Sequence, residues 1–178
     1  QELGFAGNVN DYYDRRNSYL NDVLVQRRGI PLTLALLYVE LAGQLGLIAR
    51  GVSFPGHFLV KLRMPQGEVV IDPFDGRSLS REDLDERLAP YRRRQGLVGD
   101  FEAPLGLFLQ AAPARDILAR MLRNLKEIHR SARDSVRWLA VQQRLVVLLP
   151  QSWDERRDRA LAHAALGQRE AAIRDLEA

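Results

Sequence analysis

Apolar residues occupy nearly every position between 32 and 45, where Leu, Ala, Val and Tyr recur on almost all sides of a helix. A helix that is apolar all round is typically a buried one. Pro31 can open this helix, because the backbone N–H that proline lacks would have no partner at the first helical position. Gly46 can end it. The pattern predicts a central buried helix, preceded by a shorter helix at 17–25.

Three short segments with the character of strands follow this helix: 48–54, 57–64 and 68–72. A Pro-Gln-Gly turn at 65–67 should join the last two into an antiparallel hairpin. With a two-residue loop His57 and Asp72 are diagonal neighbours, and with a four-residue loop they are directly opposed. Both registers leave the two side chains on one face of the hairpin, within reach of a hydrogen bond.

The rest of the chain becomes helical. Ser80 can cap a short helix that ends before Pro90. Gly and Pro recur between 91 and 113, which indicates a linker. We therefore expect a core domain at 1–90 and a helical region at 114–178. Four helical patterns fill the second region: 114–132, 135–149, 153–166 and 169 to the end.

The helical region has the marks of a repeat. If Pro150 is the last proline of a tetratricopeptide repeat, a unit of about 34 residues, the next unit starts at Trp153. Its small turn residue then falls on Gly167, and its small helical residue falls on Ala172. The preceding unit fits poorly, because Arg133 stands at its turn position. The two matching offsets favour a tetratricopeptide repeat, with an unrelated helical hairpin as the alternative.

Composition narrows the class of protein. The 178 residues are 46% apolar and 28% charged, as in an ordinary globular protein. No apolar run reaches the roughly 18 residues that a membrane span needs, and the first residues do not read as a signal peptide. The chain lacks cysteine, which excludes disulfides and thiolate metal sites and leads us to expect a cytoplasmic protein. It begins without Met, so upstream residues are expected to be missing.

Charge and histidine placement point away from nucleic-acid and metal sites. The net charge is +3, and nearly all the basic residues are Arg. The basic cluster at 92–94 lies beside acidic residues and is interpreted as a solvated face, since nucleic-acid binding needs several convergent cations. His129 and His163 lie in helical patterns without a second ligand at suitable spacing. We expect no metal, no cofactor, no membrane and no nucleic-acid partner.

Segments of the first domain resemble the transglutaminase-like superfamily. The core of that superfamily pairs a Cys at the start of a buried helix with a His that opens one strand and an Asp that ends the next. The matching segments here are Arg28-Gly29-Ile30-Pro31-Leu32, Gly56-His57-Phe58-Leu59-Val60 and Val70-Ile71-Asp72-Pro73. The resemblance implies an α+β, papain-like core in which a buried helix packs on a small antiparallel sheet.

A narrower resemblance covers more of the chain. Four segments are similar to a bacterial SirB-like branch of this superfamily: Asn17-Ser18-Tyr19-Leu20, Arg27-Arg28-Gly29-Ile30-Pro31, Leu45-Gly46-Leu47 and Phe54-Pro55-Gly56-His57-Phe58. That branch joins the core to a tetratricopeptide tail, which agrees with the helical pattern after residue 113. The resemblance implies an all-α tail that binds peptides.

The sequence departs from the superfamily at the nucleophile. Pro31 occupies the position of the Cys, and proline offers neither a nucleophilic side chain nor an N–H for an oxyanion hole. A thiolate mechanism is therefore impossible on this chain alone. The main hypothesis is a non-catalytic protein-binding or scaffold module, in which His57 and Asp72 are a remnant pair. The alternative is a hydrolase in which the hydroxyl of Thr33 or Ser53 replaces the thiol.

The resemblance implies a cleft that, in the superfamily's enzymes, holds the nucleophile. Four residues are candidates for binding a ligand there: Asn17, Arg27, Thr33 and His57. Asn17 and Arg27 could instead cap and tie the local backbone. His57 could be a structural residue that links its strand to Asp72. Tyr12 and Tyr13 are interpreted as packing at the rim rather than as a stacking platform. Together with the tail, these residues lead us to expect a protein or peptide partner, with the oligomeric state left open.

Overall fold

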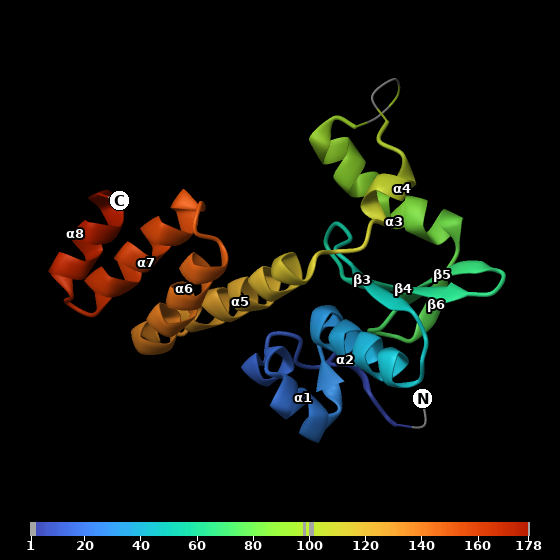
Figure 1. The fold of residues 1–178 in the computed structure, drawn as a ribbon, viewed down its shortest axis with the longest axis horizontal. Coiled ribbons are helices and arrows are strands. Elements are labelled where there is room, and N and C mark those ends of the chain that lie inside the picture. The colour runs from blue at the N-terminus through green and yellow to red at the C-terminus, as the bar shows by residue number, and fades with distance from the viewer. Residues whose placement is uncertain (1–2, 98, 100–101, 178) are drawn as a thin grey trace. The chain divides into compact units, whose positions relative to one another are not determined.

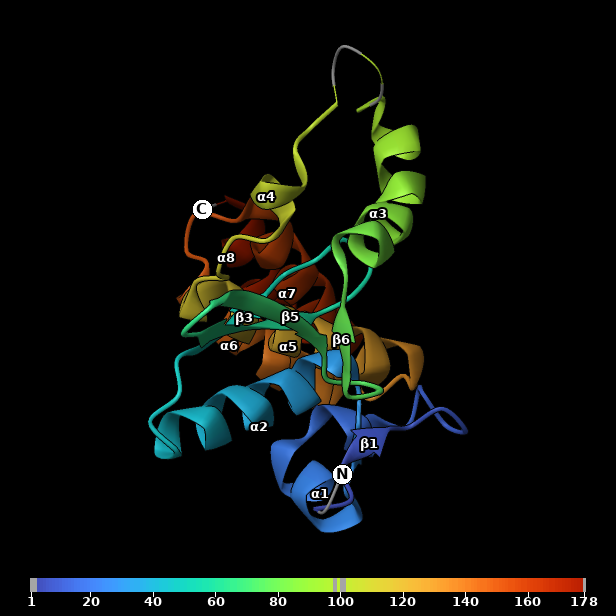
Figure 2. The ribbon, with the colours of Figure 1, turned by 90° about the vertical axis from the view of Figure 1, so that its right-hand side faces the viewer.

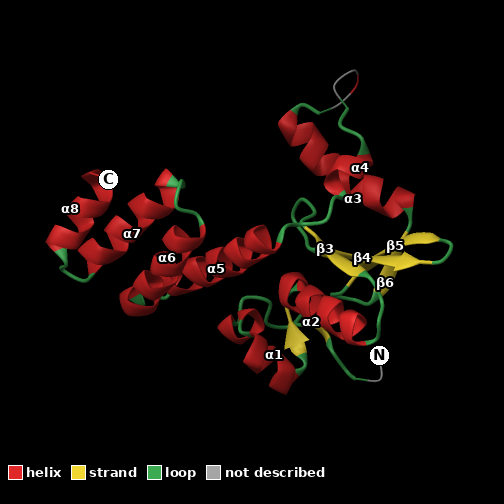
Figure 3. Ribbon diagram, in the orientation of Figure 1, coloured by secondary structure: helices red, strands yellow, loops and turns green. Residues whose placement is uncertain are grey.

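The structure is a computed structural model that describes residues 3–97, 99 and 102–177. It divides the chain into two compact units, Gln1–Pro113 and Ala114–Ala178. The first unit mixes helices with strands, and the described residues of the second are helices joined by turns (Figures 1 and 3). The predicted α+β core followed by a helical tail is therefore confirmed.

The first unit contains these elements in chain order: β1 (Ala6–Gly7), the 3-10 helix η1 (Arg15–Ser18), α1 (Leu20–Gln26), β2 (Arg28–Gly29), α2 (Pro31–Gln44), β3 (Ala49–Val52), β4 (Leu59–Met64), β5 (Gly67–Asp72), β6 (Arg77–Leu79), α3 (Arg81–Gln95) and α4 (Leu105–Phe108). Strands β3 to β6 form an antiparallel sheet in sequence order, and β1 pairs with β2 in a separate parallel ladder. Helix α2 lies on one side of the sheet, with α3 and α4 on the other (Figures 1 and 2).

The β4–β5 hairpin sets the spacing on which the candidate site depends. Met64 pairs with Gly67, so the observed register is that of the two-residue loop. Gly67 has a φ of +140°, a conformation that favours glycine. Strand β6 was not predicted; it returns directly from β5, with Asp72 paired to Arg77. This return leads the chain into α3, on the far side of the sheet from α2.

Apolar side chains between the sheet and α3 form a core cluster: Val52, Phe54, Leu59, Val70, Leu79, Leu84, Leu88 and Leu105. Tyr91 and Phe108 pack against this cluster with their rings edge to face, 5.8 Å apart. Each large apolar side chain that is fully buried contributes about 2 kcal/mol to folding. The cluster therefore fixes α3, and with it the end of β5, as one rigid frame.

Helix α2 is less buried than its apolar sequence predicts. Its first turns are in the interior, with Leu32 and Leu34 almost inaccessible to solvent. Its second half is partly open, since Leu41 is 41% exposed and Leu45, just past the helix, is 77% exposed. The prediction of a helix buried all round is thus wrong for the second half. Strands β3 and β4 pack against only one side of the helix. An apolar sequence does not show whether another element packs against the opposite side.

The predicted end of a helix before Pro90 is also wrong. Helix α3 continues through Pro90 to Gln95 and ends where Gly96 adopts a left-handed φ of +68°. Proline inside a helix removes one backbone hydrogen bond and costs about 3 kcal/mol or more in an isolated helix. Tertiary contacts on both sides of the proline hold the helix together, because Leu88 is fully buried before it and Arg92 is nearly buried after it.

The segment predicted as a linker packs against the core. Leu105 from α4 belongs to the core cluster. Further along, Ala111 forms an antiparallel bridge with Val52, and the Ala112 amide donates a 2.8 Å hydrogen bond to the Gly51 carbonyl. The boundary between the two compact units lies after Pro113, at the end of this segment.

The second unit consists of α5 (Ala114–Ser131), α6 (Ser135–Leu148), α7 (Trp153–Ala165) and α8 (Arg169–Glu177). Consecutive helices pack against one another along the unit. Asp134 caps α6 and Ser152 caps α7, each through its side-chain oxygen. The small residues Ala160 and Ala172 are buried, as close packing of the last two helices requires.

The same turn occurs twice in the tail, 34 residues apart. Gly167 has a φ of +73°, and Arg133 adopts a nearly equal φ of +56°. In the first turn the Asp134 amide donates to the His129 carbonyl, and the second repeats this bond from Gln168 to His163, at 2.9 and 3.0 Å. The expected poor fit of the first unit therefore holds for its residue types and not for its backbone.

Arg133→Gly should stabilise the tail by about 1 kcal/mol, because a non-glycine residue in the left-handed region is strained and glycine is not. Gly167→Ala is the matched control at the equivalent turn, and it should destabilise the tail by a similar amount. Both tryptophans, Trp138 and Trp153, lie in this unit. Urea unfolding followed by tryptophan fluorescence therefore measures the tail alone. No gain from Arg133→Gly would contradict the equivalence of the two turns.

Candidate functional site

His57 and Asp72 lie at one end of the β4–β5 hairpin. His57 is in the turn before β4, where its amide donates a 3.0 Å hydrogen bond to the Phe54 carbonyl. Asp72 is the last residue of β5 and is 3% exposed. His57 Nε2 and Asp72 Oδ1 are 2.8 Å apart, which confirms the predicted proximity. No other hydrogen bond of the His57 ring occurs within the described residues, so Nδ1 remains available.

Arg87 also belongs to this site, which the sequence did not indicate. It extends from α3, and its guanidinium donates to Asp72 Oδ2 at 2.7 Å. The Phe74 amide donates to Asp72 Oδ1 at 3.0 Å. Both carboxylate oxygens are therefore bound, one by Arg87 and the other by His57 and the Phe74 amide. We call His57, Asp72 and Arg87 the His–Asp–Arg cluster.

The cluster keeps Asp72 ionised. Burial of the carboxyl group raises its pKa, but the hydrogen bonds from His57, Arg87 and the Phe74 amide outweigh this effect. The pKa of Asp72 is lowered to about 2. An ionised, doubly held carboxylate fixes the orientation of the His57 ring, as in a catalytic His–Asp pair.

The start of α2 holds Pro31 and Thr33, and Thr33 is committed to the backbone. Its hydroxyl lies 2.8 Å from the Asn17 carbonyl and 3.1 Å from the Ile30 carbonyl, and it accepts a hydrogen bond from the Ile30 amide at 3.2 Å. Thr33 is 1% exposed. A β-carbon at Gly29 would lie 2.8 Å from this hydroxyl, so the glycine is needed for the close approach. These contacts give Thr33 a capping role.

Ser53 lies in the turn after β3 and is exposed. It is therefore open to solvent, whereas Thr33 is enclosed. Its role as a substitute nucleophile stays a prediction.

Asn17 is a completely buried side chain that ties the N-terminal loop. Its Nδ2 donates to the carbonyls of Asp11 and Tyr12, at 2.7 and 3.1 Å. Its Oδ1 accepts hydrogen bonds from Asn8 and Gln26, at 3.0 and 3.1 Å. This use of both ends of the amide supports the interpretation of Asn17 as a local tie rather than a ligand-binding residue.

Arg27 also has a backbone role. It ends α1 with a left-handed φ of +55°, and its amide donates to the Val23 carbonyl at 2.8 Å. Its carbonyl accepts from the Ala6 amide at 3.1 Å, beside the β1–β2 pair. The side chain is exposed, next to Gly4. The geometry therefore supports the capping interpretation of Arg27.

Aromatic side chains lie next to His57. The Phe74 ring is 6.5 Å from the His57 ring, and Tyr12 is 6.1 Å from Phe74. Tyr13 stands edge-on to Tyr12 at 5.3 Å. Tyr13 is 89% exposed, so the interpretation as rim packing does not hold for this residue.

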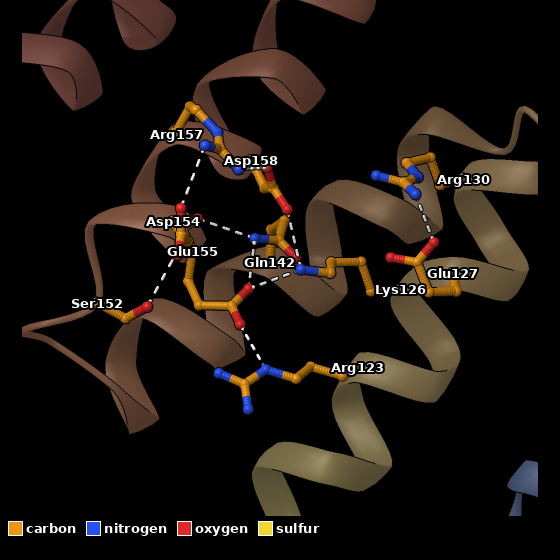
Figure 4. Close-up of polar contacts among 10 residues, drawn as sticks. All are labelled: Arg123, Lys126, Glu127, Arg130, Gln142, Ser152, Asp154, Glu155, Arg157 and Asp158. Atoms are coloured by element: carbon orange, nitrogen blue, oxygen red, sulfur yellow. Dashed lines mark hydrogen bonds and ion pairs between the residues drawn. The ribbon is translucent and has the colours of Figure 1, made fainter. Parts of the chain in front are cut away.

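A second polar cluster lies inside the tail, where α5, α6 and α7 meet (Figure 4). Lys126 Nζ contacts Glu155 Oε2 at 3.0 Å and Asp158 Oδ2 at 2.9 Å. Gln142 donates to the Glu155 carbonyl at 2.8 Å, and Arg123 donates to Glu155 Oε1 at 2.7 Å. All of these residues except Arg123 are buried. We call Arg123, Lys126, Gln142, Glu155 and Asp158 the tail charge cluster.

Electrostatics inside the tail charge cluster favour the charged forms. Burial lowers the pKa of Lys126, but the hydrogen bonds to Asp158 and Glu155 outweigh it, so the pKa is raised. Burial raises the pKa of Glu155, but bonds from Arg123, Lys126 and Gln142 outweigh it, so the pKa is lowered. The cluster is thus a set of mutually compensated charges that joins two helical hairpins.

The basic cluster at 92–94 does not form one surface. Arg92 points into the first unit, where it contacts Asp85 at 3.0 Å, Glu102 at 3.1 Å and the Ala103 carbonyl at 2.9 Å. Arg93 and Arg94 are exposed. The prediction of a solvated face is therefore wrong for Arg92 and agrees with the exposure of Arg93 and Arg94, and one cation fewer is available for a phosphate-binding patch.

The described part of the chain contains neither a metal-binding group nor a membrane-spanning helix. No group of three or more His, Asp or Glu residues there could hold a metal ion. No helix there is both long enough and apolar enough to cross a membrane.

Comparisons with known proteins agree with the fold of both units. The pattern of the Transglutaminase-like superfamily matches residues 1–123, and that of the Tetratricopeptide repeat matches residues 125–178. The protein is therefore a transglutaminase-like core joined to a tetratricopeptide tail. Because the first match covers more than half of the chain, the chain belongs to the transglutaminase-like superfamily. The predicted resemblance is confirmed for both parts.

Similar bacterial proteins extend along almost the whole chain. A UPF0162 protein of Xylella fastidiosa is 45% identical over 177 residues, and one of Pseudomonas aeruginosa is 36% identical over 176 residues. Each alignment covers 99% of this chain and 62% of the relative, so the chain spans less than two thirds of their length. Human F-box only protein 21 is 42% identical over 74 residues, which is 42% of this chain and 12% of that protein. No solved structure matches the chain.

Proposed function

We propose that this chain is a non-catalytic protein-binding module, in which the transglutaminase-like core and the tetratricopeptide tail each present a recognition surface. The His–Asp–Arg cluster serves recognition or stability in this module rather than bond cleavage. The expected partner is a protein or peptide, and we place the module in the cytoplasm, as the absence of cysteine led us to expect.

The observation that carries this proposal is the start of α2. Pro31 stands where the superfamily's enzymes have their nucleophile, and Thr33 gives its hydroxyl to backbone groups. A general base is useful only when a nucleophile lies within hydrogen-bonding reach. The oriented His57 ring therefore lacks the group that a hydrolase would place beside it at the start of α2.

The tail supports the same function independently. Tetratricopeptide repeats generally mediate protein–protein interaction, and stacked helical hairpins form extended surfaces suited to peptides. Arg133 and Gly167 adopt the same turn, which makes the tail a regular repeat rather than an unrelated helical hairpin.

The competing function is a hydrolase with Ser53 as the nucleophile and His57 as the base. The free Nδ1 of His57 is the observation in its favour. A serine hydroxyl must lose its proton during attack, so this function requires Ser53 within about 3 Å of the ring in the complex with substrate.

Activity and binding tested on the same preparation separate the two functions. The purified full chain is incubated with fluorogenic amide and ester substrates, with and without a primary amine, and we expect no turnover above that of His57→Ala. Turnover that His57→Ala and Ser53→Ala both abolish would refute the proposal. Partner binding is measured by cross-linking the full chain in a bacterial lysate, followed by mass spectrometry. We expect specific cross-links to one or both units of the wild-type chain. Val25→Ala, an exposed substitution on α1, is the control variant and should form the same cross-links.

A further inference from the structure

Three aromatic residues form a continuous strip that ends at His57: the exposed Tyr13 and Tyr12, and the half-buried Phe74. We call this strip the aromatic ledge. Tyr13 is 89% exposed and Tyr12 is 44% exposed. The planes of these two rings are inclined at 81°, so the face of one ring meets the edge of the other. Contiguous exposed aromatic rings are uncommon away from binding surfaces, where tyrosine is enriched.

Hydrogen bonds and a close packing contact hold parts of the aromatic ledge in place. The buried Asn17 amide binds the carbonyls of Asp11 and Tyr12, which fixes the backbone that carries the tyrosines. The Gly7 amide donates to the Phe74 carbonyl at 2.8 Å, and a β-carbon at Gly7 would lie 2.4 Å from the Phe74 ring. A fixed backbone and a fixed Phe74 ring leave less conformational freedom to be lost on binding, which favours affinity.

Negative charge flanks the aromatic ledge. Asp11 precedes the tyrosines, Asp75 follows Phe74, and both are exposed. Within the described residues neither carboxylate forms an ion pair; Asp75 accepts a hydrogen bond from its neighbouring Arg77 amide at 2.9 Å. Of the cations nearby, Arg16 is held by Asp14 at 2.6 Å and Arg87 by Asp72 at 2.7 Å. Two cations near these carboxylates form no ion pair within the described residues: Arg15 in η1, and Arg77, which lies two residues after Asp75.

We propose that the aromatic ledge binds an arginine side chain of an extended peptide. A guanidinium group is planar and weakly hydrated, so it stacks on tyrosine rings and gains attraction from nearby carboxylates. The available Nδ1 of His57, at the end of the ledge, can form a hydrogen bond with the peptide backbone. This inference rests on the proposed function, since it names the chemistry that the core would recognise.

The test uses the full chain and two fluorescent peptides, one with two arginines separated by glycines and one with citrulline at the same positions. Citrulline keeps the shape of arginine and lacks its charge. Fluorescence anisotropy should show that the arginine peptide binds at least about fivefold more tightly. Tyr13→Ala should weaken it by about two- to fivefold, as expected for one exposed cation–π contact, while Tyr13→Phe should retain binding.

Two further variants locate the effect. Asp11→Asn should weaken the arginine peptide and reduce the dependence of its affinity on salt concentration. Val25→Ala is the matched control, because Val25 is 85% exposed and lies on α1, outside the ledge. Thermal unfolding of each variant verifies that the core is folded.

Three results would overturn the inference: no binding of the arginine peptide, equal binding of both peptides, or binding that Tyr12→Ala and Tyr13→Ala leave unchanged. If the chain still forms cross-links with a protein partner, none of these results contradicts the proposed function. Conversely, amide or ester turnover that depends on His57 would refute the proposed function even if arginine binds at the ledge.

Discussion

Lys126→Met should lower the free energy of unfolding of the tail by about 3–5 kcal/mol. Lys126 is 8% exposed and contacts both Glu155 and Asp158, so removing its charge leaves two buried carboxylates with reduced compensation. Met fills a similar volume, which separates the loss of charge from the loss of packing. Urea unfolding followed by tryptophan fluorescence measures this change, because both tryptophans lie in the tail.

The chain provides its own control for this prediction. Lys61 is the only other lysine, and it contacts Glu68 at 3.2 Å in a pair whose carboxylate side is 56% exposed. Lys61→Met should cost the core less than about 1 kcal/mol, as is usual for a surface pair. A second variant that adds Glu155→Gln and Asp158→Asn to Lys126→Met should recover part of the lost stability. A loss below about 1 kcal/mol for Lys126→Met would show that the tail charge cluster is solvated.

Asp72→Ala should destabilise the core by about 2–3 kcal/mol. The pKa of Asp72 is lowered from 3.8 to about 2, and this difference corresponds to about 2 kcal/mol of favourable interaction with the ionised carboxylate. Near-ultraviolet circular dichroism measures the change once the tail transition, known from tryptophan fluorescence, is subtracted, because all five tyrosines lie before residue 114. Asp75→Ala is the matched control: Asp75 is exposed and accepts only a local amide bond, so its loss should cost less than about 1 kcal/mol.

The same carboxylate gives the core a defined acid response. Because the pKa of Asp72 is lower in the folded state, its contribution is fully present above pH 4 and is lost as the pH falls from about 4 through 2. The stability difference between the wild-type chain and Asp72→Ala should therefore shrink over this range. A difference that stays constant down to pH 2 would mean that the interactions of Asp72 do not depend on its charge.

Local patterns predicted the parts of the fold that depend on neighbouring residues. The hairpin needed only a turn at 65–67 and alternating strands, and its register then placed His57 beside Asp72. The start of α2 followed from Pro31 alone. Strand β6 was missed because three residues are too few to show a period of two. The course of α3 through Pro90 was missed because its stability comes from packing on distant strands.

The pairings within both polar clusters could not be predicted from the sequence. Arg87 lies 15 residues from Asp72, on a helix whose charged residues all look solvated in the sequence. Lys126 meets Asp158 across 32 residues, and each lies among other charges in its own helix. Such pairings are decided by how the helices pack, which no local pattern encodes. For the aromatic ledge a signal was present: adjacent tyrosines in a polar segment have no apolar period that would bury them.

The tail charge cluster also bears on how the tail unfolds. In an array of helical repeats each hairpin has its own stability, and cooperativity comes from the interfaces between neighbours. Here the α5–α6 hairpin supplies Lys126 and Gln142, and the α7–α8 hairpin supplies Glu155 and Asp158. Opening either hairpin alone breaks these contacts between the hairpins. The cluster therefore couples the folding of the two repeats, because its energy is gained only when both hairpins are formed.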